Sequence, residues 1–164
     1  MRLKEPRDLL LYELSAIYAG EKAIADMLKE VAGDVDDDNL AKMLKTHQRE
    51  TKDQAKILDT CFKHLGETPM DVPCGVIDAI RQEYREFTAN KPAPQVLTMF
   101  ALGGALKVEH FEIATYRGLV DKAMMMGDTE LAQNLTTILH QEEETAGKLE
   151  RCASELDHKV LAPA

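Results

Sequence analysis

Four segments of the sequence repeat apolar residues at alternating spacings of four and three, and this repeat constrains the fold more than any other feature. Such spacing places the apolar residues on one face of an α-helix, which must then pack against other helices. Glycine, proline or acidic capping residues separate the segments. We therefore predict four long helices, at about residues 6–32, 37–65, 95–126 and 128–157.

The chain has 164 residues, a length that suits one domain spanning 1–164. Only 5% of the residues are aromatic and Trp is absent, which favours helices packed through aliphatic side chains over a sheet. Between the second and third long helices, the pattern predicts a short helix at about 75–88 within a connection that can travel the length of a bundle. The expected fold is all-α, an antiparallel four-helix bundle with one long crossover.

The formal net charge of -9 disfavours nucleic acid and anionic membranes as partners, because both repel an acidic surface. No apolar stretch reaches the length of a membrane span. The three cysteines are odd in number, widely spaced and lack a C-x-x-C motif, which indicates a reducing compartment. We expect a cytoplasmic protein.

Each of the four long segments places a carboxylate where an apolar residue belongs. In LHQEEETAGKL, Glu142 occupies the apolar repeat, whereas Glu143 and Glu144 fall outside it and should face solvent. The other three segments show the same substitution. The candidate inward-facing residues are Glu21, His47, Glu50, Glu109, Glu112 and Glu142.

These candidates are expected at one height in the bundle. In an antiparallel helix pair, residues equidistant from the turn are level with each other. The midpoint of Glu21 and Glu50 falls inside the first predicted turn, and the midpoint of Glu112 and Glu142 is Gly127 in the last one. Glu109 lies one helical turn from Glu112. The sequence therefore predicts that all six side chains meet midway along the core.

Five carboxylates in an apolar interior would repel one another and raise each other's pKa. No Lys or Arg occupies the repeat at that height, so the counter-charge must come from elsewhere. Two metal ions would supply it, and oxygen ligands with an imidazole suit Fe or Mn better than Zn. A single inward Glu is more often locally satisfied or partly exposed, and His47 alone could equally be a hydrogen-bond partner in the core. The coincidence on four helices favours metal binding.

Two other features of the third long segment also lead to structural expectations. Tyr116, one turn beyond Glu112, either donates a hydrogen bond to a ligating carboxylate or simply packs in the core. The pair Gly103-Gly104 lacks side chains and would allow a neighbouring backbone to come close.

Several motifs carry a family resemblance: AGEKA around Glu21, HQRET at 47–51, the Pro-Cys step at Cys74, KVEHFEIATY at 107–116 and LHQEEE at 139–144. Through them the chain resembles the ferritin-like superfamily, and within it the YciE/YciF-type bacterial stress proteins. The resemblance implies a ferritin-like four-helix bundle with a short extra helix in the crossover, a homodimer, a dinuclear metal site and a role in stress responses. It implies no particular reaction.

The chain departs from the wider superfamily at two positions. Rubrerythrins and ferritins use Glu-x-x-His on the second and fourth helices, whereas this sequence has Glu50-x-x-Asp53 and Glu142-x-x-Thr145. A site with at most one imidazole favours harder ions and binds them more weakly. Glu109 and its partner one turn later resemble the rubrerythrin arrangement and keep redox chemistry possible.

Two functional hypotheses follow. The first is a dinuclear Fe or Mn protein that reduces peroxide or oxidises ferrous iron, with Glu50 and Glu142 bridging the ions and the other four candidates as terminal ligands. The second is a non-enzymatic structural or interaction protein whose acidic cluster is vestigial or holds a purely structural ion.

Overall fold

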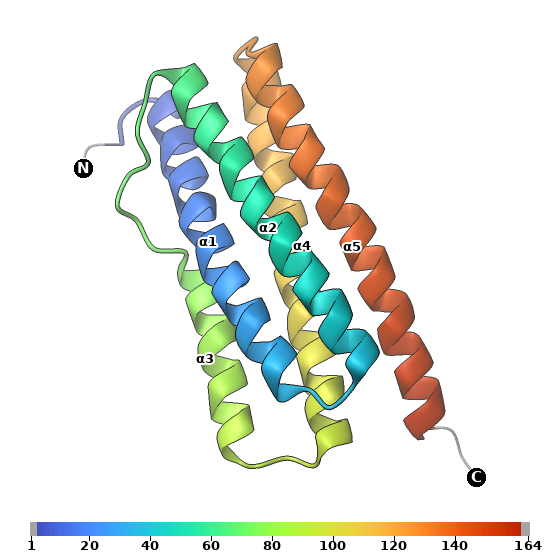
Figure 1. Ribbon diagram of the computed structural model, residues 1–164. Helices are drawn as coiled ribbons and strands as arrows, with labels where there is room; N and C mark the ends of the chain where they lie inside the picture. The colour runs from blue at the N-terminus through green and yellow to red at the C-terminus, as the bar shows by residue number, and fades with distance from the viewer. Residues whose placement is uncertain (1–2, 162–164) are drawn as a thin grey trace.

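The computed structural model describes residues 3–161, which form five α-helices and no β-strand. Four of the helices make an antiparallel bundle, and the remaining short helix, which belongs to the long crossover, lies along the outside of the bundle (Figure 1). This arrangement confirms the predicted all-α bundle. The helices are α1 (Pro6–Asp34), α2 (Asp38–Leu65), α3 (Gly75–Ala89), α4 (Pro94–Met125) and α5 (Thr129–Leu161). No helix in this described range is both long enough and apolar enough to cross a membrane.

Local capping explains where the first two helices begin. Pro6 is the first residue of α1, and Glu5 and Asp8 form a reciprocal capping box around that start. The Asp37 side chain accepts a hydrogen bond of 2.8 Å from the amide of Leu40 at the start of α2. These contacts satisfy amide groups that have no partner within the helix.

Two glycines and one aspartate set the end of α2 and the turn between α4 and α5. Gly66 ends α2 with a φ of 68°, a left-handed conformation that costs glycine little. Gly127, with a φ of 75°, occupies the turn between α4 and α5. Asp128 then accepts a hydrogen bond of 3.0 Å from the Leu131 amide. By contrast α1 continues past Gly33, and α5 extends four residues beyond its predicted end at 157.

Inside the bundle, buried apolar residues form two clusters, one toward each end. The first surrounds Tyr116 and Leu135 near the α4–α5 turn, and the second surrounds Ile24 and Leu44 near the α1–α2 turn. A layer of buried polar side chains separates them at mid-height. That layer consists of Glu21, His47, Thr51, Gln54, Glu109, Glu112, Glu142 and Thr145.

Helix α3 is held against α1 and α4 by both charge and aromatic packing. Glu30 of α1 accepts hydrogen bonds from the guanidinium groups of Arg81 and Arg85 at 2.9–3.1 Å. The rings of Phe87 and Phe100 stack with centroids 3.7 Å apart. These contacts fix α3 beside the lower half of the bundle (Figure 1).

The expectation that Gly103 and Gly104 admit a close neighbouring backbone is wrong. A Cβ placed on either residue would meet no heavy atom within 4 Å outside its own helix turn. The close approach occurs instead at Gly20, where such a Cβ would lie 3.1 Å from the Sγ atom of Cys74. The space beside Gly104 is open because α3 does not fill it.

Candidate metal centre

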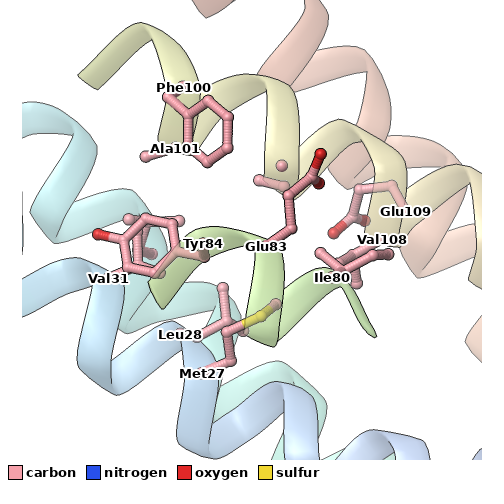
Figure 2. Close-up of a pocket in the computed structure, with 13 residues that line it drawn as sticks. Met27, Leu28, Val31, Ile80, Glu83, Tyr84, Phe100, Ala101, Val108 and Glu109 are labelled. Carbon is pink, nitrogen blue, oxygen red and sulfur yellow. The ribbon is translucent and has the colours of Figure 1, made fainter. Parts of the chain in front are cut away.

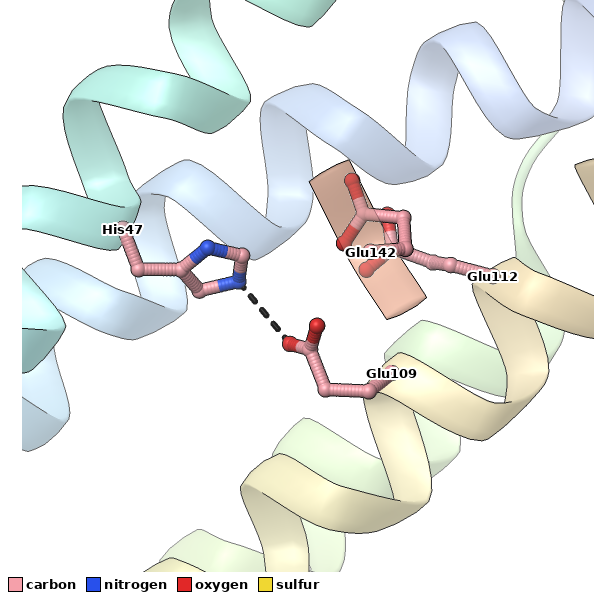
Figure 3. Close-up of side chains that lie close together, drawn as sticks. All are labelled: His47, Glu109, Glu112 and Glu142. Carbon is pink, nitrogen blue, oxygen red and sulfur yellow. Dashed lines mark ion pairs between the residues drawn. The ribbon is translucent and has the colours of Figure 1, made fainter. Parts of the chain in front are cut away.

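The centre of the polar layer holds one histidine and three glutamates from three helices. His47 comes from α2, Glu109 and Glu112 from α4, and Glu142 from α5. One potential ligand atom from each lies within 4.8 Å of the other three, and Figure 3 shows the four side chains pointing toward one another. All four are at most 4% exposed. The structure thus brings together four of the six residues that the sequence predicted.

These side chains converge because each helix repeats about every 3.6 residues. Glu109 and Glu112 are three residues apart, so both point from one face of α4 into the core. Within the EEE run of α5, Glu142 is buried while Glu143 and Glu144 face solvent. Glu144 pairs with Lys148 at 2.9 Å, one turn later on the same helix.

The site has more buried polar atoms than hydrogen-bond partners. His47 Nε2 lies 2.9 Å from Glu109 Oε1, the separation of a close ion pair, although the N–H direction does not give a hydrogen bond. Within the described range, every buried side-chain nitrogen or oxygen atom that lacks a hydrogen-bond partner belongs to this layer. These atoms are Glu21 Oε2, both ring nitrogens of His47, Gln54 Oε1, Glu109 Oε2, both oxygens of Glu112 and Glu142 Oε2. Orphaned atoms of this kind are expensive in a packed core, and a metal ion would satisfy them.

Burial raises the pKa of two of the glutamates strongly. It is the main reason that the pKa of Glu142 rises to about 9, and the negative charges of Glu109 and Glu21 raise it further. The pKa of Glu112 lies well above its ordinary value for the same reason, with Glu142 and Glu21 as its charged neighbours. In the absence of a cation, these carboxyls therefore hold protons at neutral pH.

The imidazole of His47 responds in the opposite sense. Burial alone would lower its pKa, but the carboxylates of Glu109, Glu50 and Glu142 raise the pKa to about 10. The ring is accordingly an imidazolium in the metal-free site. A metal ion would replace its ring proton, since only the neutral ring offers a lone pair to a metal.

Glu21 lies on the α1 side of the same layer and is fully buried. The Tyr116 hydroxyl donates a hydrogen bond to its Oε1 atom. Burial raises the pKa of Glu21 to about 7, and the hydrogen bond from Tyr116 partly offsets that effect. Of the two roles that the sequence left open for Tyr116, the structure shows the hydrogen bond to a candidate ligand.

Glu50 is placed differently from the other five candidates, since its side chain is 42% exposed. It lies at the rim of the layer, where its Oε2 atom is 3.8 Å from His47 Nδ1, and this neighbour lowers the pKa of Glu50. Three residues turn a helix by about 300°, so Glu50 lies about 60° from His47 around α2. The buried stripe of α2 runs instead through His47, Thr51, Gln54 and Leu58.

Gln54 was not among the candidates, yet its side chain is buried in the layer. Its Nε2 atom donates hydrogen bonds to Glu142 Oε1 and, at 3.1 Å, to Gln141 Oε1. The signal for this residue was present in the sequence, because Gln54 lies seven residues after His47 and so shares its helix face. Its amide orients the carboxylate of Glu142, which is one of the candidate ligands.

Comparison with known proteins places this geometry in a family. The model of a family described as a domain of unknown function, DUF892, matches residues 5–162. The chain belongs to the DUF892 family. Among curated proteins, it is 26% identical over 150 residues to Protein YciF of Escherichia coli strain K12, a match that covers 91% of this chain and 90% of YciF.

Solved structures agree with this membership. YcfI from Rhodopseudomonas palustris is 33% identical with a TM-score of 0.86, covering 90% of this chain and 94% of that one. The Escherichia coli stress protein YciF has a TM-score of 0.91 at 25% identity, covering 96% and 99%. A chain described as ferritin like, diiron-carboxylate, from Bacillus anthracis strain Ames, shares the fold with a TM-score of 0.73 at 21% identity over 92% and 99%. The DUF892 chain is therefore of the YciF type, and it shares its fold with a chain described as ferritin like.

Proposed function

We propose that this protein binds two metal ions, Fe or Mn, in the buried layer and uses them to oxidise ferrous iron or reduce peroxide. The observation that carries the proposal is the set of orphaned ligand atoms on His47, Glu109, Glu112 and Glu142. Carboxylate oxygens with one imidazole nitrogen are a donor set suited to these ions. Leaving ionised carboxylates buried and unpaired costs several kcal/mol each, and bound cations would offset that cost.

In this proposal the four converging residues hold the ions, and Glu21 and Glu50 complete the ligand set from α1 and from the rim. Glu142 would hold an ion from the centre of the layer, and Glu50 would do so from its exposed rim. Bound Fe or Mn would supply redox chemistry and Lewis acidity that side chains lack.

The remaining polar residues of the layer keep the carboxylates in place. Tyr116 holds Glu21, and Gln54 holds Glu142. Their hydrogen bonds restrict carboxylate rotation, which preorganises the ligands for a metal ion. Loading must also release protons, because Glu112 and Glu142 have raised pKa values and His47 is protonated in the metal-free site.

The related proteins support the finer parts of the proposal. The Bacillus anthracis chain is described as a diiron-carboxylate protein, which supports iron, and YciF is described as a stress protein, which supports a role under stress. We also propose a homodimer and a cytoplasmic location. The three cysteines, all free in the structure, agree with a reducing compartment.

The test is metal analysis of untagged protein purified without chelator, followed by anaerobic titration with Fe(II). We expect about two ions per chain in the wild type, as a dinuclear carboxylate site requires. Exposure to dioxygen or hydrogen peroxide should then produce a new near-ultraviolet absorption. Absence of Fe and Mn binding at micromolar concentration would overturn the proposal.

A matched pair of variants places the binding in this layer. Glu142→Gln keeps the shape of a buried ligand but removes its charge, and should lower the stoichiometry or affinity. Glu143→Gln alters the adjacent exposed residue, which pairs with Arg117 at 2.6 Å, and should bind metal as the wild type does.

The close His47–Glu109 pair favours a second candidate, a structural protein without turnover. An imidazolium beside a carboxylate at 2.9 Å, with protonated neighbouring carboxyls, neutralises much of the layer without any metal. This candidate predicts no more than one bound ion and no oxidation of Fe(II). The same titration therefore distinguishes the two functions.

A further inference from the structure

A small apolar cavity lies between α1, α3 and α4 and ends at the candidate metal centre. Figure 2 shows Glu109 at one side of this cavity, with Met27, Leu28 and Val108 among the apolar side chains around it. The carboxylate of Glu109 is 1% exposed, and its Oε2 atom has no hydrogen-bond partner. The cavity, which Leu44 of α2 also lines, therefore reaches a proposed ligand from the side that α3 covers.

The lining of the cavity is almost entirely hydrocarbon. Its only charged side chains are those of Glu109 and Glu83. Glu83 is 51% exposed and pairs with Lys107 at 2.7 Å, linking α3 to α4 at the surface. The cavity thus has a charged outer edge, an apolar middle and one carboxylate at its inner end.

The size and chemistry of the cavity limit what can occupy it. The cavity volume is about 20 Å³. One water needs about 10–15 Å³ of space and also two to four polar partners. The apolar middle offers no such partners, so water is poorly held there. An apolar cavity of about 150 Å³ stays dry and binds xenon, and the lining here has the same apolar chemistry around a smaller space.

A different surface depression meets the other side of the site. Most of the residues that line it have polar side chains, among them His47, Glu50, Thr145 and Lys148. Ions and polar molecules can keep hydrogen bonds and charge contacts along that side. The two approaches to the same carboxylate layer therefore differ in chemistry.

We propose that the α1–α3–α4 cavity admits dioxygen to Glu109 and the metal centre, while metal ions and peroxide arrive from the polar side. This inference rests on the proposed function and specifies its oxidant. The reaction served would take two electrons from two ferrous ions and two protons from solvent, converting dioxygen to hydrogen peroxide. Moving dioxygen from water into an apolar cavity costs little free energy, whereas hydrogen peroxide would lose its hydrogen bonds with water.

The adjacent glycines of α4 provide a matched test. Gly104 lines the cavity, and a Cβ there meets no heavy atom within 4 Å, so Gly104→Leu should fill the space. Gly103 is exposed and lies outside the cavity, so Gly103→Leu makes the same change in composition and helix propensity elsewhere. Gly104→Ala is a smaller change that retains the fold if the leucine does not.

The first measurement is xenon binding to crystals of metal-free protein, which requires no activity. We expect xenon in the wild-type cavity and in Gly103→Leu, and its loss in Gly104→Leu. Absence of xenon from the wild-type cavity would overturn the proposed route without touching the proposed metal site.

The second measurement is the rate of oxidation of bound Fe(II). Gly104→Leu should slow oxidation by dioxygen about tenfold, because a filled passage must open before each entry. Gly104→Ala should give a smaller decrease, while oxidation by hydrogen peroxide and oxidation in Gly103→Leu should keep wild-type rates. An unchanged dioxygen rate in Gly104→Leu, or equal slowing with peroxide, would contradict the route. If the wild type bound no Fe(II), the proposed function itself would fail, and this role of the cavity with it.

Discussion

The Tyr116 hydroxyl donates a hydrogen bond to Glu21, joining α4 to α1 within the core. Both side chains are fully buried, and Tyr116 belongs to the apolar cluster on one side of the polar layer. The contact therefore couples the packing of that cluster to the orientation of a proposed ligand. Removing the hydroxyl would leave a buried Glu21 oxygen without a donor.

Tyr116→Phe should lower the free energy of unfolding of the metal-free protein by about 1–3 kcal/mol, because the variant orphans a buried acceptor. Urea unfolding followed by circular dichroism measures this change, since the chain has no Trp for fluorescence. Tyr18→Phe is the control, because Tyr18 donates to Asp59 in a partly exposed pair. Equal losses in the two variants would show that burial of the Glu21 contact is unimportant.

Gln54→Met should weaken metal binding by about 10–100-fold, the usual effect of removing a group that orients a ligand. Methionine keeps the approximate volume of the side chain but cannot donate to Glu142. Calorimetric titration with Mn(II) would measure the affinity. Gln141→Ala removes only the exposed acceptor of the second Gln54 hydrogen bond, and should retain wild-type affinity.

The stability of the metal-free protein should fall as pH rises from about 5 to about 9. Glu21 and Glu142 have pKa values of about 7 and about 9 in the folded chain, against an ordinary value of 4.5. Their protons are held more tightly when folded, so the stabilisation is full below about 4.5 and is lost as pH rises through the folded values. His47, raised from 6.5 to about 10, acts in the same direction at higher pH.

The expected fall is on the order of a few kcal/mol, measured as the free energy of unfolding in urea at several pH values. Saturating Mn(II) should reduce the fall, because metal ions replace the protons, and binding at neutral pH should release protons to the buffer. A metal-free protein that becomes more stable toward pH 9 would exclude the raised carboxyl pKa values.

Glu30→Gln should loosen α3 while changing overall stability by about 1 kcal/mol or less, as expected for partly exposed ion pairs. Arg85 and Arg81 would each lose an anionic partner on α1. Hydrogen exchange of amides in 75–89 should therefore accelerate relative to those in α5. Glu86→Gln, whose partner Gln82 lies on α3 itself, should leave that exchange unchanged.

Much of the candidate site could be predicted from the sequence because helix periodicity and turn position are local properties. Glu142 at an apolar position and Gly127 as the last turn were sufficient to place a buried carboxylate at mid-height. Distinguishing Glu50 from Gln54 required more. Both residues lie on the same side of His47 around α2, Gln54 about 20° and Glu50 about 60° away. How α5 packs against that side decides how far from His47 the burial extends.

The sequence by itself thus determined the four long helices and the inward position of Glu21, His47, Glu109, Glu112 and Glu142, because a 3.6-residue repeat leaves each helix one face to bury. The tertiary structure decided the 2.9 Å approach of His47 to Glu109, the partners of Tyr116 and Gln54, and the cavity under α3. These features depend on how far apart the helices stand and how each is rotated against its neighbours. Side-chain packing between distant segments sets those quantities, and no local pattern records them.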